Sequence, residues 1–341
     1  MNIGIIGCGN IASAHIKALA MNKNVEKIVL FDIDENKAKS RTVKVNKPMC
    51  IATSIKELTR QSDCFIVCTP NNSHKNIIKE VVNLKPIPFL CEKPLASTLE
   101  DAEFIESIAP QGSIISFNYR FNYIFSTIKK YILQKDLGKC IFFGAEFNKN
   151  SALVRKEITW RDSATQSFSS GALGDLSCHL LDLLCWLTDS PINLQTIRIV
   201  SGTKVQEKQG KSIQVDDNGY ILGESDNATL FKIKTSKSEC ERELGLHLHL
   251  IFKNEEIIYT TREPYIISIK RMNDIKDTIL QLNESQILVN PEREIPFWAD
   301  SFFYLHKAWF SEIINNNHEG QLPSIKDAVH IQRIISSITT G

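Results

Sequence analysis

The sequence predicts two domains: an α/β domain with a parallel sheet, followed by an α+β domain with a large, open, mainly antiparallel sheet. Strand and helix patterns alternate from Met1 to about Phe117, which is typical of right-handed βαβ units. Beyond residue 190 strand patterns follow one another, which indicates antiparallel pairing. The chain of 341 residues is long enough for two hydrophobic cores. We expect the first domain to comprise residues 1–117 and the second residues 118–341.

Short apolar runs that end in Gly, Pro or acidic residues predict the strands of the first domain. They lie at 2–7, 27–34, 63–70, 88–94 and 113–119. Between them, apolar residues at helical spacing predict helices at 10–22, 54–60, 73–84 and 97–109.

The second domain begins with a helix near 124–136 and a strand at 139–149. A polar loop at 148–170 leads to an apolar helix at 171–187. Further strands are expected at 194–202, 227–236, 245–253, 255–261 and 266–271. Two closing helices, near 299–316 and 325–338, are expected to be able to pack back on the first domain.

Composition excludes several classes of partner. Forty basic side chains against thirty-nine acidic ones leave no surplus charge for nucleic acid or an anionic membrane. No apolar run reaches the roughly 18 residues of a membrane span, and the start lacks the pattern of a signal peptide. Nine cysteines without a CxxC pair are typical of reduced thiols, which predicts a cytoplasmic protein.

A glycine-rich turn after the first strand predicts a dinucleotide site of Rossmann type. Gly7-x-Gly9-x-x-Ala12 allows a tight turn, a close approach of backbone to a pyrophosphate, and close helix–strand packing. Asp32 ends the second strand, 25 residues after Gly7, where a carboxylate can bind ribose hydroxyls. Residues 32–34 contain no Arg or Lys, so a 2′-phosphate is expected to meet only negative charge there. The pattern therefore favours NAD over NADP.

The apolar helix at 171–187 carries polar residues on one stripe. Asp175, His179 and Asp182 recur at i, i+4 and i+7 and so share a face. This is the arrangement expected where a helix lines a polar pocket, although a hydrogen-bonded core histidine gives the same spacing. A metal site is disfavoured, because no nearby His or Cys pair completes a ligand set.

Four motifs in order extend over nearly the whole chain. They are CTPNNSHK (68–75), CEKP (91–94), FNYRF (117–121) and GALGDLSCHLLDLL (171–184). With the glycine-rich turn, they resemble the Gfo/Idh/MocA family of sugar dehydrogenases. The resemblance implies that Lys93, Asp175 and His179 match the family's catalytic positions, and that the chain forms a homodimer or homotetramer. One departure is Ser177, where many members have Gly.

A narrower resemblance lies in NKNSALVRKEITWRD (148–162), SGALGDLSCHLLDLLCWL (170–187) and WADSF (298–302). It points to the branch of the family that begins kanosamine synthesis, and implies NAD-dependent oxidation of the C3 hydroxyl of glucose 6-phosphate to a 3-keto sugar. Inositol, another polyol or a nucleotide sugar remains an alternative substrate. A non-catalytic regulator that senses NAD or sugar is the alternative from another class.

Oxidation of a secondary alcohol requires a base for the hydroxyl proton while a hydride leaves carbon. His179 is the preferred candidate, since imidazole titrates near pH 6.5. Asp175 can orient the ring or bind a neighbouring hydroxyl, and Lys93 can polarise the reacting oxygen or act as the base instead.

Other side chains are expected around cofactor and substrate. Expected cofactor contacts are Gly7, Gly9, Asn10, Ile11, Ala12, Asp32, Thr69, Pro70, Asn71, Glu92, Lys93, Trp160 and Arg161. Expected substrate contacts are Lys93, Arg120, Arg155, Lys156, Arg161, Asp175 and His179. The arginines and Lys156 are phosphate candidates, because cationic donors suit phosphate oxygens.

Overall fold

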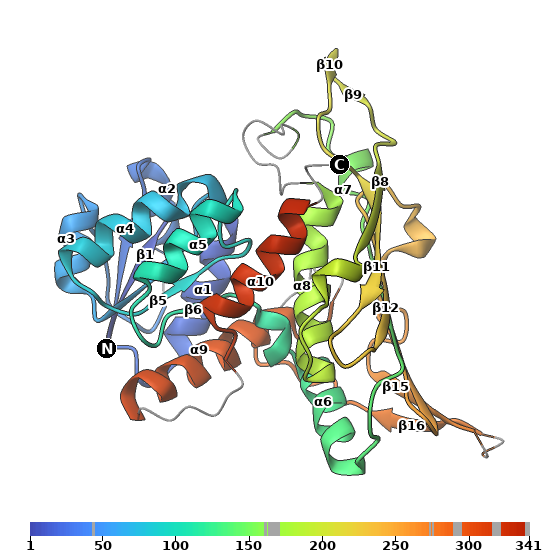
Figure 1. Cartoon of the computed structure of the whole chain (residues 1–341). Helices are drawn as coiled ribbons and strands as arrows, with labels where there is room; N and C mark the ends of the chain where they lie inside the picture. The colour runs from blue at the N-terminus through green and yellow to red at the C-terminus, as the bar shows by residue number, and fades with distance from the viewer. Residues whose placement is uncertain are drawn as a thin grey trace. The chain divides into compact units, whose positions relative to one another are not determined.

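A computed structural model describes residues 1–42, 45–159, 162, 171–272, 274, 276–288, 295–315 and 322–337. The chain divides into two compact units (Figure 1). Unit 1 comprises Met1–Phe121 and Ala299–Arg333, and unit 2 comprises Asn122–Trp298 and Ile334–Gly341. Within these described ranges no helix is long and apolar enough to cross a membrane.

Unit 1 contains a parallel six-stranded sheet in the order β3-β2-β1-β4-β5-β6. Its strands are β1 (Asn2–Ile6), β2 (Lys27–Phe31), β3 (Met49–Ile51), β4 (Cys64–Val67), β5 (Phe89–Cys91) and β6 (Ile114–Ile115). This topology confirms the predicted α/β Rossmann fold. The strand expected at 113–119 is shorter than predicted, because the chain turns into the 3₁₀ helix η2 (Asn118–Phe121).

Helices accompany the sheet of unit 1 (Figure 1). They are α1 (Asn10–Met21), α2 (Glu35–Arg41), α3 (Ile55–Gln61), η1 (Asn71–Ser73), α4 (His74–Leu84), α5 (Leu99–Ile108), α9 (Trp298–Asn315) and most of α10 (Ile325–Ser337). Ser54 and Thr98 cap the N-termini of α3 and α5 through their hydroxyl oxygens. Helix α2 was not predicted, since ENKAKSR carries almost no apolar residues. Side chains of α9, including Trp309 and Phe310, pack into the core of unit 1.

Unit 2 is built on an eight-stranded sheet in the order β16-β15-β14-β13-β7-β12-β11-β8. Its strands are β7 (Phe142–Asn148), β8 (Arg198–Gly202), β11 (Asn218–Glu224), β12 (Leu230–Ser236), β13 (Gly245–Ile251), β14 (Glu255–Thr260), β15 (Ile266–Arg271) and β16 (Thr278–Gln281). All neighbouring strands pair antiparallel except β7 and β12. The mainly antiparallel sheet confirms the fold class predicted for this part of the chain.

One face of this sheet is buried. Alternate residues of β7 and β12, such as Phe143 and Ile233, point into the core. Helix α8 (Ala172–Thr188) packs against β11, β12 and β7. Figure 1 shows this helix running along the sheet. The remaining elements are α6 (Tyr123–Lys135), α7 (Ser151–Val154), η5 (Leu194–Thr196), η6 (Glu241–Glu243) and the hairpin β9 (Glu207–Lys208) with β10 (Lys211–Ser212).

Strands at the β8 end of this sheet expose apolar side chains. Val200 of β8 and Leu222 of β11 are largely accessible in the isolated chain. Homodimer or homotetramer formation stays a prediction.

Candidate active site

The turn between β1 and α1 has the geometry expected of a dinucleotide-binding turn. Gly7 has φ +91°, and a Cβ there would lie 2.8 Å from the backbone nitrogen of Thr69, so only glycine fits. Gly9 begins α1 without a side-chain cap, and no described atom lies within 4 Å of a Cβ built on it. The N-terminus of α1 therefore has the space and backbone donors that a pyrophosphate requires.

The carboxylate of Asp32 is fixed against this turn. Its Oδ2 accepts a hydrogen bond from the backbone N–H of Cys8 at 2.7 Å, and its Oδ1 accepts one from Asp34 at 2.9 Å. The side chain remains partly exposed beyond the end of β2. This position suits the ribose hydroxyls of an adenine nucleotide.

Arg41 also lies on this turn, which the sequence did not reveal. Its Nε donates to the carbonyl oxygen of Cys8 at 3.0 Å, and its Nη2 donates to Oδ1 of Asn10 at 3.3 Å. A cation therefore lies on this turn, although residues 32–34 themselves carry none. Arg41 comes from the end of α2, the helix that lacked a periodic apolar signal, so its placement had no basis in the sequence pattern.

The segment after β4 lies beside the glycine-rich turn. The Cγ2 of Thr69 lies 2.7 Å from where a Cβ on Gly7 would be, so the two segments touch. The hydroxyl of Ser73 donates to Oγ1 of Thr69 at 2.8 Å, which fixes that side chain. Asn71 is buried in η1 and donates to the carbonyl oxygen of Ala96. The predicted contacts Thr69, Pro70 and Asn71 thus follow a strand next to β1 at the edge where such sheets bind ligands.

Glu92, after β5, is the buried end of a chain of two imidazoles. Its Oε1 lies 2.9 Å from Nε2 of His15, and Nδ1 of His15 lies 2.9 Å from Nε2 of His306. Burial raises the pKa of Glu92, but the hydrogen bond and charge of His15 outweigh it and hold that pKa below its usual value. Burial holds the pKa of His306 well below that of free imidazole. A charged carboxylate and a neutral His306 therefore lie inside unit 1.

Lys93 follows this carboxylate directly. Its backbone N–H donates to Oε2 of Glu92 at 3.3 Å, and its half-buried side chain starts from the same sheet edge as Thr69. The predicted residues Thr69, Glu92 and Lys93 thus share the carboxyl edge of neighbouring strands β4 and β5.

In unit 2, Asp216 fixes the start of α8. Its carbonyl oxygen accepts from the N–H of Ala172 at 2.9 Å, and its Oδ2 accepts from that of Leu173 at 2.8 Å. A Cβ on Gly171 would lie 2.0 Å from Oδ1 of Asp216, so this close approach requires glycine at position 171. Burial raises the pKa of Asp216 against the opposing effects of Leu173 and Lys237.

Asp175 and His179 lie one turn apart near this fixed end of α8. The ammonium of Lys237, just after β12, lies 2.9 Å from Oδ2 of Asp175. His179 is 7% exposed and Asp182 is 1% exposed, so the stripe becomes more buried along the helix. The helix is confirmed, whereas Lys237 was missed because its strand carries no motif that points to α8.

The other predicted substrate contacts are dispersed. Arg120 is buried in unit 1, where its Nη2 lies 3.2 Å from Oδ2 of Asp327. Arg155 lies in unit 2 and forms an ion pair with Asp162, while Lys156 is exposed. Trp160 and Arg161 lie outside the described residues. In the described part of the chain, no group of three or more His, Cys, Asp and Glu side chains is placed to bind a metal ion.

Family models match both parts of the chain. Residues 1–119 match the oxidoreductase family with an NAD-binding Rossmann fold, and residues 125–255 match the Gfo/Idh/MocA C-terminal domain. Among curated proteins, the glucose-6-phosphate 3-dehydrogenase of Bacillus subtilis is 33% identical over 98% of this chain and 94% of its own length. The myo-inositol 2-dehydrogenase of Thermotoga maritima is 24% identical over 65% of this chain and 64% of its own.

Solved structures agree on the fold. A levoglucosan dehydrogenase in complex with NADH and levoglucosan matches with a TM-score of 0.84 and 19% identity, covering all of this chain and 96% of that one. The family models confirm the predicted NAD cofactor and the predicted oxidoreductase activity. The chain therefore belongs to the Gfo/Idh/MocA family and is an NAD-dependent dehydrogenase of the sugar-oxidising kind.

Proposed function

We propose that the enzyme oxidises the C3 hydroxyl of glucose 6-phosphate to the 3-keto sugar. The observation that carries this proposal is the 33% identity to the Bacillus subtilis glucose-6-phosphate 3-dehydrogenase, which extends over nearly the full length of both chains. The inositol and levoglucosan dehydrogenases match at lower identity, between 22% and 27%, although one inositol dehydrogenase also matches over 96% of this chain.

The cofactor is proposed to bind at the carboxyl edge of the unit 1 sheet. The pyrophosphate would take backbone N–H groups at Gly9, Asn10 and Ile11, where α1 begins against open space. Asp32 would bind the adenosine ribose, with Arg41 beside it. The segment 69–71 and Glu92 would contact the nicotinamide half, and Trp160 and Arg161 remain candidates to cover it.

The chemistry follows from the residue types. NAD, when bound, accepts the hydride that leaves the carbinol carbon, so that the hydroxyl proton must go to a base. We assign that base to His179 and assign Lys93 to stabilise negative charge on the reacting oxygen. Asp175, fixed by its ion pair with Lys237, would accept a hydrogen bond from a neighbouring hydroxyl or from the imidazole. One sugar and one NAD⁺ yield one 3-keto sugar, one NADH and one proton.

The substrate is tested by initial rates of NADH formation. Glucose 6-phosphate, glucose, myo-inositol and a UDP-sugar are compared at equal concentration, with an aminotransferase added to remove any 3-keto product. We expect the highest kcat/KM with glucose 6-phosphate. Turnover confined to myo-inositol or to the UDP-sugar would replace this substrate with the alternative. NAD binding without turnover of any of the four would favour a regulator that senses NAD.

A further inference from the structure

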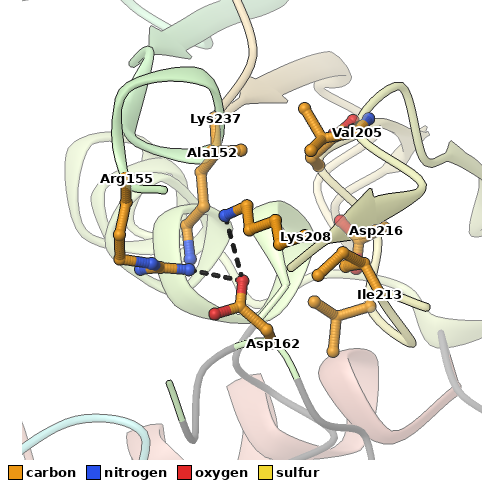
Figure 2. Close-up of a pocket in the computed structure, with 10 residues that line it drawn as sticks. Ala152, Arg155, Asp162, Val205, Lys208, Ile213, Asp216 and Lys237 are labelled. Carbon is orange, nitrogen blue, oxygen red and sulfur yellow. Dashed lines mark hydrogen bonds and ion pairs between the residues drawn. The ribbon is translucent and has the colours of Figure 1, made fainter. Parts of the chain in front are cut away.

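Unit 2 contains a small cavity whose lining includes three cationic side chains (Figure 2). Arg155 follows α7, Lys208 belongs to β9, and Lys237 follows β12. Figure 2 shows their nitrogen-bearing ends directed toward the same part of the cavity. Three separate segments of the chain thus bring positive charge to one place.

Two of these cations share one carboxylate. Oδ1 of Asp162 lies 2.5 Å from Nη2 of Arg155 and 3.3 Å from Nζ of Lys208. Lys208 is only 7% exposed, and a lysine is almost never this buried unless it is paired, as it is here with Asp162. Burial raises the pKa of Asp162, but hydrogen bonds from Thr159 and Arg155 outweigh it and keep the carboxyl ionised. A single negative charge therefore faces two positive ones.

The other carboxylates that line the cavity accept hydrogen bonds from backbone N–H groups. Asp217 accepts from the N–H groups of Lys204 and Val205 at 2.8 and 2.7 Å. Asp216 accepts from Leu173 at the start of α8. These hydrogen bonds hold both acids as structural caps, and the charge of Lys237 also acts on Asp216, where it opposes the rise in pKa caused by burial.

Arg155 has a buried donor that the described residues do not satisfy. Its Nε is inaccessible to solvent and has no hydrogen-bond acceptor in the described part of the chain. Buried polar groups nearly always have a partner, so this donor indicates a site for an acceptor other than the described residues. A guanidinium presents its donors in a plane that suits the oxygens of a phosphate.

Lys237 connects the cavity with the polar stripe of α8. That lysine lines the cavity, and its ammonium is also 2.9 Å from the carboxylate of Asp175. Asp175 is 31% exposed at its side chain and precedes His179 by one turn. A ligand bound through Lys237 would therefore be adjacent to the residues assigned to the reacting hydroxyl.

We propose that this cavity binds the phosphoryl group of the sugar substrate, with Arg155, Lys208 and Lys237 as its ligands. The inference rests on the proposed function, in which the substrate is a hexose phosphate. It adds two lysines to the expected phosphate contacts and explains why they are withdrawn from solvent. The phosphoryl group would then fix which hydroxyl of the ring is presented to α8.

The test compares Lys208→Met with Lys211→Met. Lys211 pairs with Lys208 across the same hairpin but is exposed. We expect Lys208→Met to lower kcat/KM for glucose 6-phosphate about tenfold or more, the usual cost of one charge-assisted hydrogen bond. Inorganic phosphate should compete with the substrate and raise the melting temperature of wild type and of Lys211→Met, but not of Lys208→Met. Equal effects of phosphate on all three proteins would overturn the proposal.

Arg155→Lys provides a second variant if Lys208→Met does not fold. It keeps the charge but removes the planar donors, so inorganic phosphate should bind it about tenfold more weakly than wild type. Wild-type affinity would contradict the assignment. The phosphate measurements need no turnover, so they distinguish failure of the proposed anion site from failure of the proposed substrate. A wild-type enzyme that ignores glucose 6-phosphate but binds phosphate in a Lys208-dependent way would refute the proposed substrate and retain the anion site.

Discussion

Carboxylates have different partners in the two units. In unit 1, Glu92 faces a chain of two imidazoles, of which the second, His306, is neutral. In unit 2, Asp162 faces a guanidinium and an ammonium, and Asp175 faces a second ammonium. One arrangement places a carboxylate beside two imidazoles inside a core, whereas the other gathers several charges of both signs around a cavity.

The difference indicates what each carboxylate is for. The core of unit 1 encloses Glu92 and His306, so their interactions contribute to stability and fix the strand end that carries Lys93. The unit 2 charges line open space, and Arg155 retains a buried donor without an acceptor among the described residues. Because Glu92 is also assigned to the nicotinamide half, we expect substitutions in the first network to change stability as well as NAD affinity, and those in the second to change substrate binding.

The largest expected effect is at His179. Replacing the assigned base by Asn in His179→Asn should lower kcat by about 10²- to 10⁴-fold, since proton transfer then lacks its acceptor. NAD affinity, measured by fluorescence titration of the same sample, should not change, because His179 is not among the residues assigned to the cofactor. His249→Asn is the control, since that imidazole is paired with Glu256 on the sheet of unit 2. Normal turnover by His179→Asn would transfer the role of base to Lys93.

Removing the charge of the unit 1 carboxylate should cost stability. Glu92→Gln keeps the shape of the side chain but replaces the charge-assisted hydrogen bond to His15 by one between neutral groups. This loss should lower the free energy of unfolding by about 2 kcal/mol. Urea denaturation with intrinsic fluorescence measures this change. The matched variant Glu80→Gln, at an exposed position of α4, should change it by less than about 0.5 kcal/mol. Equal effects of the two variants would mean that the hydrogen bond between Glu92 and His15 contributes nothing to the free energy of unfolding.

Asp32→Asn tests the nucleotide end of unit 1. The amide should weaken NAD binding about tenfold, because an ionised acceptor for the ribose hydroxyls is lost. NADP should lose less affinity, since the negative charge opposing a 2′-phosphate disappears while Arg41 stays. The ratio of kcat/KM for the two cofactors measures the shift, with exposed Glu35→Gln as control. A ratio that does not move would contradict the placement of the ribose beside Asp32.

The smallest expected effect is a pH dependence at His306. Its pKa is well below 6.5 in the folded enzyme, so below pH 6.5 the unfolded chain binds a proton that the folded chain does not. Stability from this group is therefore present above pH 6.5 and is lost as pH falls, by about 1 kcal/mol over the first pH unit. Urea denaturation of His306→Asn should show a correspondingly shallower pH slope than wild type. Identical slopes would show that the ring does not titrate in this way.

The sequence predicted those parts of the molecule whose cause is local. The glycine-rich turn requires Gly7 at positive φ, and α8 follows from an apolar stretch with helical spacing. Both are properties of a few consecutive residues. The seven-residue strand β11 was missed, although Tyr220 and Leu222 alternate with buried residues, because two glycines interrupt the pattern.

The contacts that complete each site are not local. His15 and His306 are separated by 291 positions, and Asp175 and Lys237 lie on different elements of unit 2. Lys208 stands in a two-residue strand, within a charged segment for which the sequence predicts no helix or strand. Nothing in the spacing of such residues distinguishes a buried cation from a surface one, so only the folded chain reveals them.

The central claim, oxidation at C3 of glucose 6-phosphate, is tested most directly by following the hydrogen itself. Glucose 6-phosphate carrying deuterium only at C3 is converted with NAD in the presence of the coupled aminotransferase, and the NADH is examined by mass spectrometry. We expect each NADH to gain one deuterium, and the labelled sugar to react more slowly than the unlabelled one when hydride transfer limits the rate. NADH without deuterium, formed at the same rate as from unlabelled sugar, would contradict it.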